Sequence, residues 1–133
     1  MTRDGAVLLG KLAIAAYDAA RKSGHPPPPG DLDTAAEALR PVVAADPADA
    51  DAQYDLALIA ERKGDYNRAR QGYLAALLAD PRYANARINL VFLTLKHGSV
   101  DEARHHAERY AATFPGDPTG ASLAQVVAAA APR

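Results

Sequence analysis

Few residues in this chain could do acid–base or metal chemistry. His97, His105 and His106 are the only clustered histidines, and Asp101 lies four residues before His105. On a helix the consecutive His105 and His106 would point to different faces, and an Asp–His pair four residues apart is common on helix surfaces. The chain has no HExxH motif, glycine-rich phosphate loop or nucleophile motif. We therefore expect no catalytic residue, metal or cofactor, and predict that the protein is not an enzyme.

The composition favours closely packed helices. Apolar residues make up 49% of the 133 residues, Ala dominates them, and aromatic residues are only 6%. Ala is the best helix former, whereas a sheet would need more β-branched and aromatic side chains. The net charge of −1 argues against a nucleic-acid partner, and the lack of cysteine excludes disulfides and thiolate zinc sites.

The sequence also leads to expectations about membranes and location. The longest apolar stretch near the start, residues 6–20, is interrupted by a glycine, a lysine, a tyrosine and an aspartate. It is too short and too polar to span a bilayer, and it is a poor secretory signal. We expect no membrane insertion and a cytoplasmic location, or a periplasmic one if the chain is a fragment.

Residues that end or interrupt helices recur with a period of 34. The period holds for glycines, alanines and prolines: Gly30, Gly64 and Gly98; Ala35, Ala69 and Ala103; Pro47, Pro81 and Pro115. Three residue types that share one period indicate an internal repeat. The best-formed copy, residues 50–81, has the pattern of two amphipathic helices joined by a tight turn at Gly64.

Helical periodicity and the placement of Gly and Pro predict seven helices. They are expected near residues 4–22, 31–45, 47–63, 65–79, 81–97, 99–114 and 119–131. The first helix should bury an apolar stripe that includes Leu8 and Leu12. The four prolines at 26–29 predict a stiff polyproline II spacer, or alternatively a docking peptide for an aromatic groove.

Several helix ends carry specific signals. Asp4 and Asp46 are predicted N-caps, the second followed by Pro47 as the first helical residue. Ser99 begins a capping box, in which a hydroxyl and a Glu carboxylate satisfy each other's free amides. Pro41 lies within the second helix and should kink it or remove a hydrogen bond.

Together these features resemble the tetratricopeptide repeat. The residues that carry the resemblance are Leu56, Ala57, Gly64, Asp65, Tyr66, Ala69, Tyr73, Ala76 and Pro81 in one unit, Leu90, Gly98, Ala103 and Pro115 in the next, and Gly30, Asp31, Leu32, Ala35, Leu39, Val42 and Pro47 before them. The resemblance implies an all-α fold, a right-handed α-α superhelix of about seven helices. We expect a single domain over residues 1–133, made of an N-terminal helix and proline-rich loop at 4–29, a degenerate half-repeat at 30–49, full units at 50–83 and 84–117, and a capping helix at 118–133.

The resemblance also implies a function. Arrays of this family bind extended or helical peptides along the first helix of each pair, so we expect a non-catalytic protein–protein interaction module that acts as an adaptor, scaffold or assembly factor. The implied peptide- or protein-binding residues are Asp51, Tyr54, Asp55, Leu58, Arg62, Asn85, Ile88, Asn89, Phe92 and Lys96.

The residue types support this assignment. Tyr54, Leu58, Ile88 and Phe92 are large apolar residues that the core stripe does not need, and such residues often mark an interaction surface. Asn89 resembles the family's Asn that binds the peptide backbone, because its amide offers a donor and an acceptor. An acidic C-terminal peptide fits poorly, because several carboxylates share the same predicted surface.

Three alternatives remain open at this point. A terminal helix could fold into the groove and cover these residues. The array could be a self-association module that forms homo-oligomers, or the chain could be a regulatory fragment of a larger enzyme or secretion component. Acidic residues outnumber basic ones in residues 31–65, and basic residues outnumber acidic ones in residues 68–109. This asymmetry fits either a solvated surface or head-to-tail association.

Overall fold

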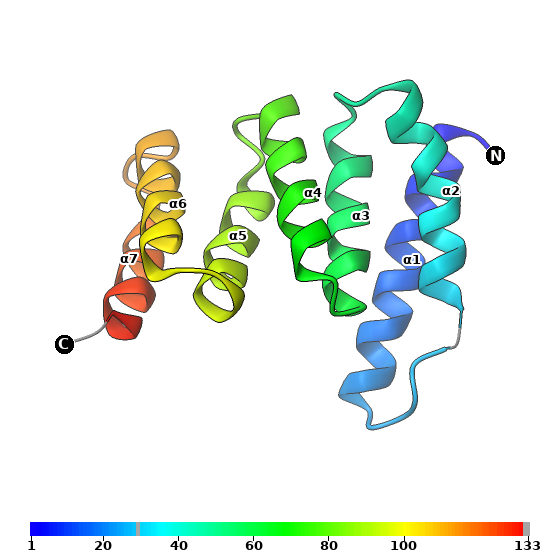
Figure 1. Ribbon diagram of the computed structural model, residues 1–133, viewed down its shortest axis with the longest axis horizontal. Coiled ribbons are helices and arrows are strands. Elements are labelled where there is room, and N and C mark those ends of the chain that lie inside the picture. Colours follow the sequence, from blue (N-terminus) through cyan, green and yellow to red (C-terminus); the bar gives the residue numbers. More distant parts are fainter. Residues whose placement is uncertain (29, 132–133) are drawn as a thin grey trace. The chain divides into compact units, whose positions relative to one another are not determined.

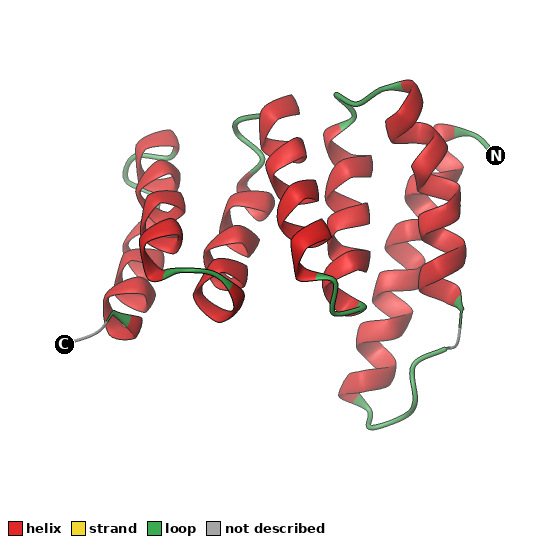
Figure 2. Ribbon diagram, viewed as in Figure 1, coloured by secondary structure: helices red, strands yellow, loops and turns green. Residues whose placement is uncertain are grey.

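A computed structural model describes residues 1–28 and 30–131, and all regular structure in these ranges is α-helical (Figure 1). The helices are α1 (Arg3–Lys22), α2 (Asp31–Ala45), α3 (Ala50–Arg62), α4 (Tyr66–Ala79), α5 (Ala84–His97), α6 (Val100–Thr113) and α7 (Pro118–Ala130). Figure 2 shows only helices and connecting loops in this part of the chain. The prediction of an all-α fold is confirmed.

The N-caps of α1 and α3 differ from the predicted residues. The cap of α1 is Thr2 rather than Asp4, and its hydroxyl accepts from Gly5 N at 3.0 Å. The cap of α3 is Asp49 rather than Asp46, because residues 46–49 form a turn closed by a bond from Asp49 N to Asp46 O of 3.1 Å. The third predicted cap, Ser99, is confirmed, since its hydroxyl accepts from Glu102 N at 3.0 Å.

The two proline signals have different outcomes. Pro41 lies inside α2, and the helix continues past it to Ala45, although proline has no N–H to donate to the carbonyl four residues earlier. Of the proline-rich stretch, Pro26, Pro27 and Pro28 lie in the loop after α1, and Pro29 lies outside the described residues. The spacer and docking interpretations of this stretch stay predictions.

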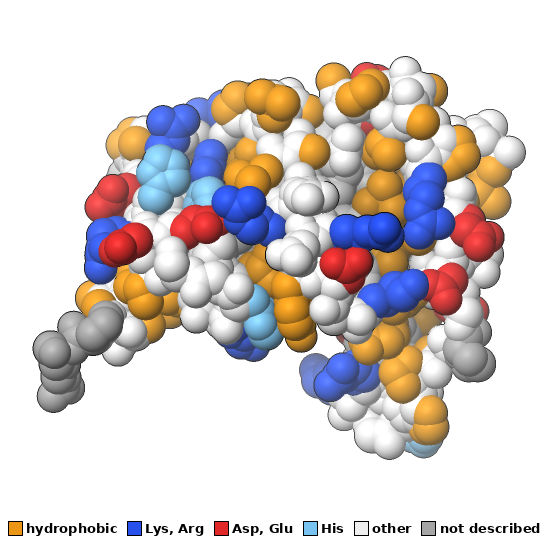
Figure 3. Space-filling view, viewed as in Figure 1, with side chains coloured by type: hydrophobic (Ala, Val, Ile, Leu, Met, Phe, Trp, Pro, Cys, Tyr) orange, Lys and Arg blue, Asp and Glu red, His pale blue; other side chains and the backbone are white. Residues whose placement is uncertain are grey.

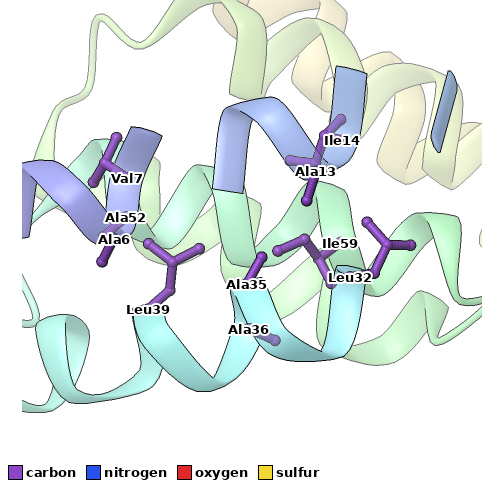
Figure 4. Close-up of a cluster of buried hydrophobic side chains, with 10 residues drawn as sticks. All are labelled: Ala6, Val7, Ala13, Ile14, Leu32, Ala35, Ala36, Leu39, Ala52 and Ile59. Carbon is purple, nitrogen blue, oxygen red and sulfur yellow. The ribbon is translucent and has the colours of Figure 1, made fainter. Parts of the chain in front are cut away.

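The chain divides into two compact units, Met1–Ala79 and Asp80–Arg133. In the first unit α1 packs on α2, α3 packs on α4, and α3 also contacts both helices of the first pair. The core between α1, α2 and α3 is built from small and branched side chains (Figure 4): Ala6, Val7, Ala13, Ile14, Leu32, Ala35, Ala36, Leu39, Ala52 and Ile59. Such side chains let the helix backbones approach closely.

The contact between α3 and α4 depends on a glycine. A Cβ atom at Gly72 would lie 2.7 Å from Cβ of Ala57 and 3.1 Å from its Cα. The two predicted close-packing positions, Ala57 and Ala69, are fully buried, as is Tyr73. The sequence therefore identified Ala57, Ala69 and Tyr73 as packing residues of this helix pair but missed Gly72.

The exposed face of α1 differs from the prediction. Leu8 and Leu12 are 57% and 59% exposed, whereas the residues that α1 buries are Ala6, Val7, Gly10, Ala13 and Ile14. Because Ala is common on both faces of this helix, the apolar pattern did not reveal which side packs. The structure places the two leucines outside the core.

In the second unit α6 packs on both α5 and α7. Its core is formed by Val91, Ala103, Ala107, Tyr110, Leu123 and Val127. Tyr110 connects α6 to the start of α7, because its hydroxyl donates to Asp117 Oδ2 at 2.9 Å, and Asp117 is the N-cap of α7. The ring of Tyr110 also lies 4.9 Å from that of Phe114, between ring centres.

Candidate functional site

The first of three charged contacts between α1 and α3 lies at their N-terminal ends. Arg3 donates from Nε to Asp49 Oδ2 at 2.7 Å and from Nη2 to Oδ1 at 2.9 Å. This is the bidentate geometry typical of a guanidinium and a carboxylate. Arg3 holds the pKa of the Asp49 carboxyl below its usual value. Arg3 Nη2 also lies 3.4 Å from Oδ2 of Asp51, so this predicted binding residue is exposed but contacts α1.

The second contact is buried. Asp55 is 1% exposed; its Oδ1 accepts from Lys11 Nζ at 3.2 Å, and within the described residues its Oδ2 has no hydrogen-bond partner. Burial raises the pKa of this carboxyl, and the charge of Lys11 opposes that effect. Gly10 of α1 packs over Asp55, with its Cβ position 3.5 Å from Oδ2. The prediction that Asp55 faces an open groove is therefore wrong.

The third contact lies at the C-terminal ends of the two helices. Arg62 donates from Nε and Nη2 to the two carboxylate oxygens of Asp18, each at 2.9 Å, and Asp18 raises the pKa of the guanidinium. The hydroxyl of Tyr17 donates to the backbone oxygen of Arg62 at 3.1 Å. Arg62, another predicted binding residue, is thus held by α1.

The three contacts show that α1 and α3 run in the same direction. Residues 3, 11 and 18 of α1 meet residues 49, 55 and 62 in the same order, with a spacing near seven residues, or two helical turns. Sequence reasoning missed the α1 partners Arg3, Lys11 and Asp18. Their charges oppose those of Asp49, Asp55 and Arg62 at matching spacing, which is the signal that could have identified them.

The other predicted residues of α3 lie toward α4 and the core. The Tyr54 ring lies 5.7 Å from the ring of Tyr73, between centres, at an interplanar angle of 48°. Tyr73 in turn donates its hydroxyl to Glu61 Oε1 at 2.5 Å. Leu58 is half-buried and packs against the core of the first unit. For Asp51, Tyr54, Leu58 and Arg62 a binding role stays a prediction.

The predicted binding residues of α5 are more accessible than those of α3. Asn85, Phe92 and Lys96 are exposed, while Ile88 and Asn89 are half-buried. Their spacing of three, four, seven and eleven residues places all five on one helix face. Ile88 packs partly against the core of the second unit, whereas Phe92 is 43% exposed. This α5 face is the candidate functional site.

A buried histidine lies between α5 and α6. His106 is 4% exposed, and its Nδ1 is 2.9 Å from Nη1 of Arg87. Because a guanidinium can only donate, Nδ1 must accept this hydrogen bond and the ring is neutral. Burial is the main cause that lowers the pKa of His106 to about 4; the charge of Arg87 adds to it, and Glu102, whose Oε1 is 3.7 Å from Nε2, opposes it.

Two further findings concern residues 1–28 and 30–131. No group of three or more His, Cys, Asp or Glu side chains there could hold a metal ion. No helix in these ranges is long and apolar enough to cross a membrane.

Helix pairs that repeat every 34 residues and pack through small side chains define a helical-repeat protein. Comparison with known families identifies which kind of helical repeat the chain contains. A tetratricopeptide repeat model matches residues 60–126, which are 67 of the 133 residues, and a second such model matches residues 30–86. The chain belongs to the tetratricopeptide repeat family, and the resemblance inferred from the sequence is confirmed.

Solved structures share this fold. The type III secretion translocator chaperone SycD of Yersinia enterocolitica is 17% identical with a TM-score of 0.67, over 97% of this chain and 82% of that one. PcrH in complex with the chaperone binding region of PopD is 22% identical with a TM-score of 0.65, over 97% and 90%. The second TPR domain of human RPAP3, in complex with an HSP70 peptide, is 19% identical with a TM-score of 0.64, over 90% and 98%. No curated protein matches the chain in sequence.

Proposed function

We propose that this chain is a non-catalytic interaction module that holds a segment of a partner protein against the exposed face of α5. The observation that carries the proposal is Phe92, a large aromatic side chain that is 43% exposed. Asn85 and Lys96 are exposed on the same helix face. Exposed aromatic residues beside polar groups are typical of the centres of protein interfaces.

The side chains of this face offer complementary contacts. Phe92 would anchor an apolar side chain, and the amides of Asn85 and Asn89 can both donate to and accept from a peptide backbone. Lys96, in the last turn of α5, would pair with a carboxylate. Phe92 and Lys96 are one turn apart, about 6 Å, which is the length of about two residues of extended chain. The face therefore fits an extended segment with an apolar residue and an acidic residue two positions apart.

Fold and charge support a protein partner. The PcrH and RPAP3 structures contain a partner segment or peptide on the same fold. The net charge of −1 does not favour a polyanion such as nucleic acid. The strongly perturbed histidine, His106, is buried against Arg87 rather than exposed to substrate, which supports a non-catalytic role as an adaptor, scaffold or assembly factor.

Selection from a displayed library of random 12-residue peptides tests this proposal. The selected peptides are synthesised, and their affinity is measured by calorimetry for the wild-type protein, Phe92→Glu and Lys96→Glu. We expect Phe92→Glu to weaken binding at least about tenfold, as loss of an interface anchor does. Lys96→Glu should weaken binding of peptides with an acidic residue and have less effect on the others.

Leu78→Glu is the matched control, because Leu78 is 88% exposed on α4. It introduces the same charge on a large exposed apolar residue, and it should leave the affinity unchanged. Circular dichroism would establish that all variants keep their helix content. Wild-type affinity in Phe92→Glu, or an equal loss in Leu78→Glu, would exclude the α5 face as the binding site.

A further inference from the structure

Two arginines of the second unit lie together without a carboxylate partner. Arg87 of α5 is half-buried and donates from Nη1 to Nδ1 of His106 at 2.9 Å. Arg109 follows His106 by three residues, so it lies one turn further along the same side of α6. Within residues 1–28 and 30–131 neither guanidinium forms an ion pair. Arg87 and Arg109 form an arginine pair whose two positive charges the described residues do not neutralise.

The repeat supports the closeness of these side chains. In the first unit, three residues of α3 and α4 line one hollow of about 410 Å³. Their equivalents, 34 residues later, are basic residue types: Gln53 corresponds to Arg87, Gly72 to His106 and Ala75 to Arg109. Because equivalent positions of a repeat point in the same direction, the arginine pair and His106 share one face of the α5–α6 helix pair. The second unit thus carries long basic side chains where the first carries small or uncharged ones.

The carboxylates of α6 closest in sequence to the arginine pair face other groups. Glu102 is one turn before His106, away from Arg109, and its Oε1 is 3.7 Å from Nε2, the other ring nitrogen of His106. Glu108 lines a hollow between α6 and α7. Burial and the positive charge of Arg109 both lower the pKa of Arg87. The two guanidinium groups therefore repel each other, and a bound anion would relieve this repulsion.

A third arginine lies one turn beyond Arg109. Arg82 donates from Nη1 to the backbone oxygen of Thr113 at 3.4 Å, and its guanidinium is 4.9 Å from the centre of the Phe114 ring. Its neighbour Asp80 accepts from the backbone N of Arg82 at 3.0 Å, and the Arg82 guanidinium forms no ion pair within the described ranges. Figure 3 shows Lys or Arg side chains at the upper end of α6, beside two histidine side chains. Positive charge therefore continues from the arginine pair to the C-terminal end of α6.

We propose that the arginine pair binds a phosphate group, with Arg82 at the edge of the site. A phosphate group carries a charge of about −1.5 to −2 at neutral pH and three acceptor oxygens, which matches two guanidinium groups that donate through planar forks. A carboxylate has one charge and is satisfied by one guanidinium, as Asp18 is by Arg62. Free phosphate and a phosphorylated residue share this chemistry, and the test separates the two sources. The inference goes beyond the proposed function, since Arg87 packs toward α6 and is not part of the α5 face.

A titration of ¹⁵N-labelled protein with sodium phosphate at constant ionic strength tests the site. We expect saturable chemical-shift changes centred on Arg87, His106 and Arg109, and acetate should bind at least about tenfold more weakly, because it carries a single charge. Arg109→Gln removes one charge from an exposed side chain, and Arg87→Gln keeps an N–H donor for His106. Each substitution should weaken phosphate binding at least about tenfold, as loss of a hydrogen bond to a charged group does.

Arg104→Gln is the matched control. Arg104 is an exposed arginine of the same helix, but it pairs with Asp101 at 2.6 Å. The substitution removes the same charge as Arg109→Gln does, and it should keep the phosphate affinity within about twofold, because an exposed ion pair contributes little. Circular dichroism would establish that all variants keep their helix content. If Arg87→Gln loses helix, Arg109→Gln decides the outcome.

A short peptide with one phosphoserine identifies the source of the phosphate group. If this peptide binds more tightly than inorganic phosphate, the site takes a phosphorylated residue; if it binds equally or more weakly, the site takes free phosphate. Three results overturn the proposal: no saturable change with phosphate, equal affinity for acetate and phosphate, or an equal loss in Arg104→Gln and Arg109→Gln. The peptides selected for the α5 face should bind Arg109→Gln as tightly as the wild type, so failure of this proposal is distinguishable from failure of the proposed function.

Discussion

Mild acid should weaken the second unit through His106. In the folded protein the neutral ring accepts a hydrogen bond from Arg87 at 2.9 Å. Protonation would remove that acceptor and place two positive charges side by side. The charged groups around the ring are Arg87 from α5 and Glu102 and His105 from α6, and the net result with burial is a pKa of about 4 instead of 6.5.

The sign and size of the effect follow from the difference between the pKa of His106 in the folded and in the unfolded state. Because this pKa is lower in the folded state, the unfolded chain binds more protons between pH 6.5 and pH 4. The stability due to His106 is complete above pH 6.5 and is lost as the pH falls toward 4. At 1.36 kcal/mol per pKa unit the total is about 3 kcal/mol, of which about 2 kcal/mol would be lost between pH 7 and pH 5.

Urea unfolding followed by circular dichroism at pH 7 and pH 5 measures this loss, and hydrogen exchange of α5 and α6 assigns it to the second unit. His106→Gln keeps an acceptor for Arg87 but cannot be protonated, so its unfolding free energy should change by about 2 kcal/mol less between the two pH values than that of the wild type. His105→Gln, at the exposed neighbouring position, should alter the pH dependence much less than His106→Gln, because His105 contributes less to the low pKa of His106 than burial or Arg87 does. An identical pH dependence in His106→Gln and the wild type would show that protonation of His106 does not cause the loss.

Two further predictions concern packing and the buried carboxylate. Gly72→Ala should destabilise the protein by about 1–3 kcal/mol in urea unfolding, because its Cβ would lie 2.7 Å from that of Ala57. Gly120→Ala is the control: its nearest contact would be at 3.4 Å, so it should be neutral or stabilising. Equal effects of the two substitutions would contradict the close packing at Gly72. Lys11→Met should lower the free energy of unfolding by about 2 kcal/mol at pH 7, since it leaves the Asp55 carboxylate buried without its cation. This loss is smaller than for a fully buried ion pair, because Lys11 is half exposed. Because the pKa of Asp55 is raised, this carboxyl takes up a proton as the pH falls, and the variant should regain stability. A loss of stability that grows on acidification would show that the buried Asp55 carboxylate is not its cause.

The repeat could be predicted from the sequence because its signals are local. A glycine, a proline or a small packing residue acts within one turn or one helix pair, so the period and the packing role of Ala57 were evident. Helix starts were harder. Asp46 and Asp49 are both good N-caps, and Pro47 favours the earlier start, but the chain forms a turn first and Asp49 begins the helix.

The candidate site could be predicted only in part, because exposure depends on packing between distant segments. The residues of α5 lie on one face, as their spacing requires. Asp55 has the same periodic placement on α3, but α1 lies over it and Lys11 neutralises it. No property of residues 50–62 alone indicates this. The exposure of Leu8 and Leu12 was missed for a related reason, since the charged residues Lys11 and Asp18 of α1 face α3, and the two leucines are left outside the core.

We propose that a partner segment binds to the α5 face. The most direct measurement is a titration of ¹⁵N-labelled protein with a selected peptide, followed by chemical-shift changes of the backbone amides. The largest changes are expected at Asn85, Phe92, Lys96 and their neighbours. Changes confined to α1 or to α2 and α4, with α5 unaffected, would contradict binding at this face.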